Sequence, residues 1–134
     1  MIRKLIHIAN TTRVSSDTMV ELLAKIAAAK TRPTTLILDN ARYQHCKKVM
    51  AEAERLGIEL LFLPSYSPNL NVIERLWKFT KAKALRGKHY RDFQLFQQAV
   101  DHCLDKTATG YAAEMKSLMT LNFQTFDKTS FLAA

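Results

Sequence analysis

The feature that most constrains this 134-residue chain is an alternation of apolar runs and helix-like segments over residues 34–83. Two short apolar runs, residues 35–38 and 58–63, flank a segment of helical periodicity, and another such segment starts at residue 72. Short apolar runs without polar alternation are typical of strands in a parallel sheet, and a helix between them is typical of a crossover connection. The pattern predicts an α/β fold in which both faces of the strand at Thr34–Leu38 are covered.

Two carboxylates stand at the ends of these predicted elements. Asp39 ends the first apolar run, and Glu74 lies in the first turn of the following helix. Because ligands collect outside the carboxyl ends of parallel strands, we expect both side chains to face one cleft. Carboxylates suit Mg²⁺, with Mn²⁺ as a substitute, and ions paired ~3.5–4 Å apart serve in-line phosphoryl displacement. Two plain alternatives stay open: Asp39-Asn40 as an ordinary turn, and Asn71 with Glu74 as a helix capping box.

Two motifs surround these carboxylates. They are Asp39-Asn40-Ala41-Arg42-Tyr43 and Leu63-Pro64-Ser65-Tyr66-Ser67-Pro68-Asn69-Leu70-Asn71-Val72-Ile73-Glu74-Arg75-Leu76-Trp77. With these motifs the chain resembles the DDE transposases of bacterial insertion sequences in the Tc1/mariner-like superfamily. The 34 residues between Asp39 and Glu74 equal the spacing typical of that family. The resemblance implies that Asp39 and Glu74 are catalytic residues and metal ligands, the second and the last of the family's three acidic groups.

The resemblance also implies a fold, an activity and partners. The fold would be the C-terminal portion of an RNase H-like domain with additional C-terminal helices, a single partial catalytic domain with its core at residues 1–90 and a helical extension at 91–134. The activity would be Mg²⁺-dependent DNA strand cleavage and strand transfer at transposon ends. The partners would be transposon-end DNA, target DNA and another transposase subunit. The family's first catalytic Asp has no counterpart here, which favours an alternative: a truncated, non-catalytic protein that binds DNA or a transposase and regulates it.

The distribution of charge supports a nucleic-acid partner. The chain carries 20 Lys and Arg against 12 Asp and Glu, a net charge of +8, which favours a polyanion. Six of the basic residues fall between positions 75 and 88: Arg75, Lys78, Lys81, Lys83, Arg86 and Lys88. With Asn40 they are the candidate DNA-binding residues, and the ordinary alternative is a solvated helix surface.

The cysteines and the hydropathy bear on location. Cys46 and Cys103 are isolated and lie on apolar helix faces, as expected of buried thiols in a reducing cytoplasm. No run of about 18 apolar residues predicts a membrane span. The resemblance adds an association with the bacterial nucleoid.

The remaining sequence predicts further elements, from local periodicity and from helix stop signals. They are a strand at residues 2–8, helices at 15–29, 45–56, 72–86, 93–106 and 111–119, a rigid loop at 64–68 and an irregular tail from 120. Two buried stripes are expected. They are Cys46, Val49, Met50, Ala53 and Leu56 in one helix, and Ile73, Leu76, Trp77 and Thr80 in another.

Overall fold

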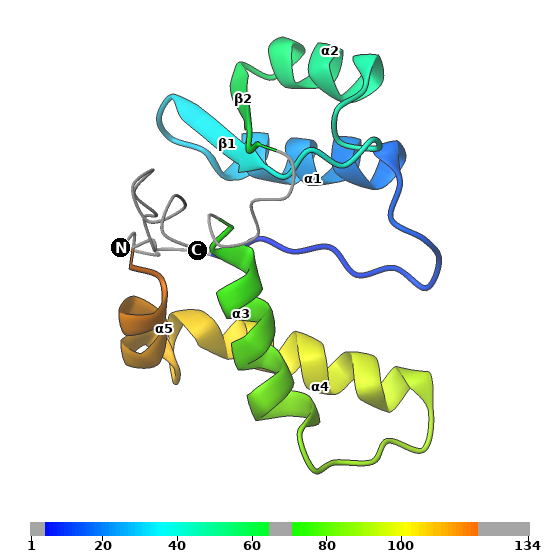
Figure 1. Cartoon of the computed structure of the whole chain (residues 1–134), viewed down its shortest axis with the longest axis vertical. Helices are drawn as coiled ribbons and strands as arrows, with labels where there is room; N and C mark the ends of the chain where they lie inside the picture. Colours follow the sequence, from blue (N-terminus) through cyan, green and yellow to red (C-terminus); the bar gives the residue numbers. More distant parts are fainter. Residues whose placement is uncertain (1–4, 65–70, 121–134) are drawn as a thin grey trace, which may run out of the picture.

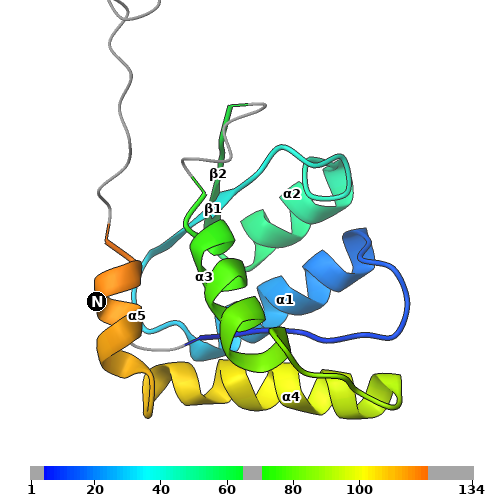
Figure 2. The same ribbon diagram turned by 60° about the horizontal axis from the view of Figure 1, so that its bottom comes forward.

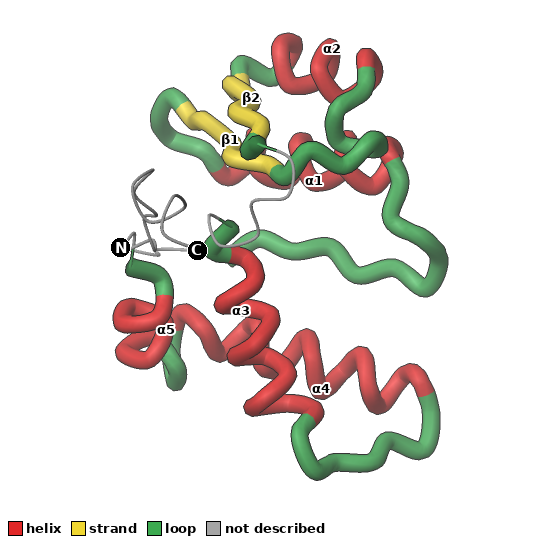
Figure 3. The backbone as a smooth tube through the Cα atoms, viewed as in Figure 1, coloured by secondary structure: helices red, strands yellow, loops and turns green. Residues whose placement is uncertain are grey.

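The chain is seen in a computed structural model that describes residues 5–64 and 71–120. Figures 1 and 3 show a small sheet with the helices α1 and α2 in one half and a cluster of helices in the other. The elements in chain order are α1 (Ser16–Ala29), β1 (Thr34–Leu38), α2 (Lys47–Arg55), β2 (Ile58–Phe62), α3 (Ile73–Thr80), the π-helical turn η2 (Lys81–Leu85), α4 (Phe93–Asp105), the 3-10 turn η3 (Lys106–Ala108) and α5 (Ala112–Leu118). None of these helices is long and apolar enough to cross a membrane.

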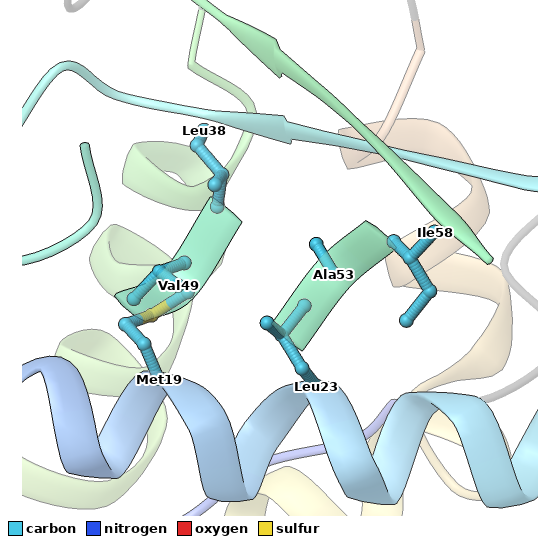
Figure 4. Close-up of a cluster of buried hydrophobic side chains, with 6 residues drawn as sticks. All are labelled: Met19, Leu23, Leu38, Val49, Ala53 and Ile58. Atoms are coloured by element: carbon cyan, nitrogen blue, oxygen red, sulfur yellow. The ribbon is translucent and has the colours of Figure 1, made fainter. Parts of the chain in front are cut away.

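The sheet confirms the predicted α/β class. Strands β1 and β2 pair in parallel, with Thr34 opposite Ile58 and Leu38 opposite Phe62, and α2 is the crossover between them. The main core lies where α1 and α2 pack on this sheet (Figure 4). Its buried side chains are Met19, Leu23, Leu38, Val49, Ala53 and Ile58. Full burial of a Leu or Val side chain contributes about 1.5–3 kcal/mol, so this cluster fixes the crossover.

The prediction that both faces of β1 are covered is wrong. Burial alternates along both strands, and Ile37 and Leu61 on the outer face are 59% and 53% exposed. The inner face carries the side chains that belong to the core, such as Leu36, Leu38 and Ile58. An apolar run therefore marked the strand correctly, but it did not reveal that α1 and α2 pack into a single core on one face.

Helices α3, α4 and α5 form a second buried cluster with η2. Its buried residues are Leu76, Thr80, Ala84, Cys103, Thr107 and Met115. Burial raises the pKa of the Cys103 thiol above its ordinary value, which confirms one of the two cysteines predicted to be buried, whereas Cys46 is only half-buried. The predicted stripe on α3 is half wrong, because Ile73 and Trp77 are 53% and 46% exposed while the other two members are buried.

The helix predicted at residues 72–86 is not α-helical throughout. It changes at Lys81 into a π-helical turn, which the Arg86 N–H closes by donating to the Lys81 carbonyl at 2.9 Å. Such i→i+5 turns are rare in proteins, and those that occur often lie at functional sites. Gly87 follows with φ of 71°, so the chain reverses directly after the turn.

The strand predicted at residues 2–8 is wrong over its described part. Residues 5–8 are irregular and lie between α1 and α4, as Figure 2 shows. Their neighbours include Lys25 of α1 and Val100 of α4, and His7 Nε2 lies 3.5 Å from Asp101 Oδ1. The alternation of apolar residues in this segment thus serves packing between helices and not pairing in the sheet.

The other boundaries follow their local signals closely. Helix α1 begins after the N-cap Ser15, and the Asp92 carboxylate caps α4 by accepting from the Leu95 N–H at 2.9 Å. Helix α2 ends before Gly57, but Met50 is exposed against expectation. The predicted rigid loop, apart from its first residue, and the predicted tail beyond residue 120 lie outside the described residues.

Gly57 is a position where only glycine fits without strain. Its φ is +62°, and a Cβ there would meet Lys30 Nζ at 3.3 Å, the ammonium that donates to the Leu56 and Gly57 carbonyls. We expect Gly57→Ala to lower the free energy of unfolding by about 1–2 kcal/mol. Urea unfolding followed by circular dichroism measures the change. The control is Gly110→Ala, where φ is not positive and a Cβ meets no atom within 4 Å. Equal losses in both variants would contradict the assignment.

Candidate active site at the carboxyl ends of the strands

Asp39 directly follows β1, at the end of the sheet to which both strands run. The Leu63 N–H donates to the Leu38 carbonyl at 2.7 Å, so the parallel ladder continues to the residue before Asp39. The Asp39 side chain is exposed, and its Oδ1 accepts from the Ala41 N–H at 3.3 Å. This bond is the one expected if Asp39-Asn40 is an ordinary turn. The carboxylate stays at the surface, and its second oxygen bonds no residue that the structure describes.

The next residue, Asn40, is held by a histidine that the sequence analysis did not single out. His45 Nδ1 donates to Asn40 Oδ1 at 2.7 Å, and the imidazole stacks on Phe62 with ring centres 4.3 Å apart. Backbone bonds from Gln44 and His45 to the Ala41 carbonyl close the turn that brings the ring back. The end of β2 therefore supports the loop after β1 through the stacking of His45 on Phe62. In the sequence, this contact was signalled only by a polar residue five positions after Asn40.

Glu74 lies in the first turn of α3 and is exposed. The alternative of a capping box does not hold, because Val72 is the N-cap and Glu74 is the second helical residue. Asn71 Oδ1 instead accepts from the Ile73 N–H at 3.0 Å, which still fixes the start of the helix. In Figure 1 the arrows of both strands run toward the half of the molecule that contains α3. That Asp39 and Glu74 converge on one ion stays a prediction.

The donor chemistry of these two residues suits a hard cation. Mg²⁺ prefers oxygen ligands and is commonly held by one or two carboxylates together with waters and substrate phosphates. Asp39 and Glu74 are exposed carboxylates of this kind. Within residues 5–64 and 71–120, no group of three or more His, Cys, Asp or Glu side chains is placed to hold a metal ion.

Half of the six basic candidates are engaged within the protein. Arg75 Nη1 donates to the carbonyls of Leu118 and Thr120 at 3.2 and 2.6 Å, which ties α3 to the end of α5. Lys83 Nζ lies 2.9 Å from a Glu114 carboxylate oxygen, and this hydrogen bond raises the pKa of Lys83. Lys88 Nζ donates to the Lys83 carbonyl at 3.2 Å.

The other three basic candidates line a common hollow. Lys78, Lys81 and Arg86 are exposed and line one shallow hollow of about 440 Å³, together with Ala82 and Leu85. The Lys81 ammonium also lies 5.6 Å from the centre of the Trp77 ring. The basic residues between positions 75 and 88 therefore form two sets with different surroundings, which the spacing in the sequence did not separate.

Comparison with known proteins bears on the same stretch. Residues 3–97 match the sequence profile of a family described as DDE superfamily endonuclease, a range that contains Asp39, Glu74 and all six basic candidates. An uncharacterized protein of Sinorhizobium fredii, designated y4pE/y4sA, is 31% identical over 90 residues. The aligned part spans 66% of this chain and 62% of that protein.

The bond between Asn40 and His45 predicts coupled effects on stability. His45→Phe keeps a ring to stack on Phe62 but removes the donor, and Asn40→Ala removes the acceptor. In a double-mutant cycle we expect a coupling of about 0.5–1 kcal/mol in the free energy of unfolding, the usual size for one hydrogen bond. As the control, Asn40→Ala combined with His102→Phe on α4 should be additive. A cycle without coupling for Asn40 and His45 would show that the bond does not order this loop.

Proposed function

We propose, because the chain belongs to the DDE superfamily of endonucleases, that it is the catalytic part of a transposase of a bacterial insertion sequence, of the Tc1/mariner-like type with an RNase H-like fold. The observation that carries this is the placement of two exposed carboxylates, Asp39 after β1 and Glu74 at the start of α3, within the matched residues. The reaction is hydrolysis of a phosphodiester at a transposon end, followed by attack of the freed 3′-OH on target DNA.

In this proposal each residue has a definite task. Asp39 and Glu74 hold the divalent ion, Mg²⁺ or Mn²⁺, which when bound lowers the cost of charge that develops on the phosphoryl oxygens. The Ala41 N–H bond to Asp39 and the Ile73 N–H bond to Asn71 keep the two carboxylates at fixed places on their elements. Asn40, oriented by His45, lies beside the first of them and contacts the DNA. Fixed placement matters because errors of about 1 Å cost a large factor in rate.

The substrate is DNA and the working assembly includes another transposase subunit. The basic residues of α3 and η2 support DNA as the partner, since Lys78, Lys81 and Arg86 are exposed and line one hollow. The same observation favours the alternative function, a non-catalytic protein that binds DNA or a transposase and regulates it. Cationic contacts to phosphates give binding without any contribution from Asp39 or Glu74.

Cleavage of a labelled transposon-end duplex with Mg²⁺ or Mn²⁺ separates the two functions. Glu74→Gln and Asp39→Asn remove charge with little change in shape, and each should lower the rate at least about 10³-fold, because residues of one catalytic unit fail together. The control variants Glu54→Gln and Asp105→Asn change exposed carboxylates on α2 and α4 and should cleave at the wild-type rate. Cleavage that survives in Glu74→Gln contradicts the proposed site. Binding without cleavage by the wild-type chain supports the regulatory alternative.

A further inference from the structure

We propose that Lys78, Lys81 and Arg86 form a phosphate-binding site for the DNA backbone, and that the π-helical turn η2 assembles it. The three residues are called the cation triad below. The inference rests on the proposed function for its partner, but it concerns binding and not cleavage. It assigns the six basic residues between positions 75 and 88 to two functions, three of them to contacts within the protein and three to DNA.

The surroundings of the triad suit an anion. The three side chains line one hollow with Ala82 and Leu85; its surface is mostly apolar, and no acidic residue among those that the structure describes takes part in the lining. The side chains of Lys78 and Arg86 make no hydrogen bond or ion pair with residues of the described part of the chain. Three exposed cationic side chains at one hollow, with no carboxylate of the described residues in its lining, favour an anion such as a phosphate.

The wide turn explains why Arg86 belongs to this group. In an α-helix each residue rotates by about 100°, so a residue five positions after Lys81 would point about 140° away from it. In η2 the Arg86 N–H instead reaches the Lys81 carbonyl at 2.9 Å, and one wider turn closes over these five residues. Arg86 is thereby brought back toward the side of Lys81 and Lys78. Single π-turns of this kind are rare and often lie at functional sites.

The other three basic residues between positions 75 and 88 do not belong to the site. Arg75, Lys83 and Lys88 donate to backbone carbonyls or to Glu114, so their charges already serve the packing of α3, η2 and α5. Lys83 is further held over the rings of Phe79 and Tyr111, at 5.5 and 5.1 Å from their centres. Their removal would loosen the helical half, whereas removal of the exposed triad leaves those contacts intact.

A duplex of mixed sequence tests the site without any divalent ion. Each phosphate contact contributes about 0.9 to the slope of log K against log salt concentration for duplex DNA. We expect Lys78→Gln, Lys81→Gln and Arg86→Gln each to reduce that slope by about one, and the triple variant to reduce it by two to three. The matched controls Lys47→Gln, Lys106→Gln and Arg91→Gln change exposed cations outside the hollow and should leave the slope within a few tenths. Equal effects in triad and control variants overturn the proposal.

Trp77 supplies a local probe, because it is the single tryptophan of the chain and Lys81 lies over its ring. Adding the duplex should change its fluorescence in the wild type and not in Lys78→Gln/Arg86→Gln, which keeps the contact between Trp77 and Lys81. Inorganic phosphate at the same phosphate concentration should produce no saturable change. A saturable response to inorganic phosphate that the duplex does not match would assign the hollow to a free anion and overturn the DNA proposal.

The outcome separates this inference from the proposed nuclease. If the wild-type chain binds DNA through the triad but does not cleave it with Mg²⁺ or Mn²⁺, the phosphate-binding site is supported and the proposed nuclease activity is contradicted. If the wild-type chain cleaves DNA and the triple variant binds and cleaves equally well, the phosphate-binding site is contradicted and the nuclease activity is supported. Far-ultraviolet circular dichroism and the urea midpoint of the triple variant should match the wild type, since all three side chains are exposed.

Discussion

The parallel pairing of β1 with β2 is the constraint on which the rest of this structure depends. Parallel neighbours need a crossover, and α2 supplies it by packing Val49 and Ala53 against Leu23 of α1. Once this core is closed, both strands must end at the same edge. The loop after β1 then lies against the end of β2, and the stacking of His45 on Phe62 is the direct consequence. The candidate site therefore lies at the edge of the sheet whose position the packing of this core determines.

Local signals in the sequence were sufficient where structure is decided locally. The run at Thr34–Leu38 marked a strand, Ser15 and Asp92 marked helix starts, and Gly57 marked a helix end that requires a positive φ. The resemblance also led to the correct superfamily from the motifs around Asp39 and Glu74. These features depend on a few neighbouring residues, so periodicity and turn chemistry are enough to find them.

The errors concern properties that depend on distant parts of the chain. Whether Ile37 is covered depends on which face α1 and α2 choose, and the residues of β1 are apolar in either case. The exposure of Trp77 depends on the packing of α4, and η2 depends on a single shift in hydrogen bonding at Lys81. Hydrophobic periodicity predicts a regular α-helix, and it does not reveal a π-turn such as η2, in which the hydrogen bond spans one residue more. The contact of His45 with Asn40 likewise needed the folded loop.

Helix α3 is the element that connects the Glu74 carboxylate to the cations. At a rise of about 1.5 Å per residue, Lys78 and Lys81 lie roughly 6 and 10 Å along the axis from Glu74. Phosphates of one DNA strand follow at about 3.4 Å along the duplex axis, so these distances correspond to roughly two and three nucleotides. A strand whose reacting phosphate lay at Glu74 would meet the cations within its next few phosphates if it ran along the helix. The buried residues Leu76 and Thr80 hold α3 rigidly between its two ends, so the spacing of charge along it is set by the core beneath.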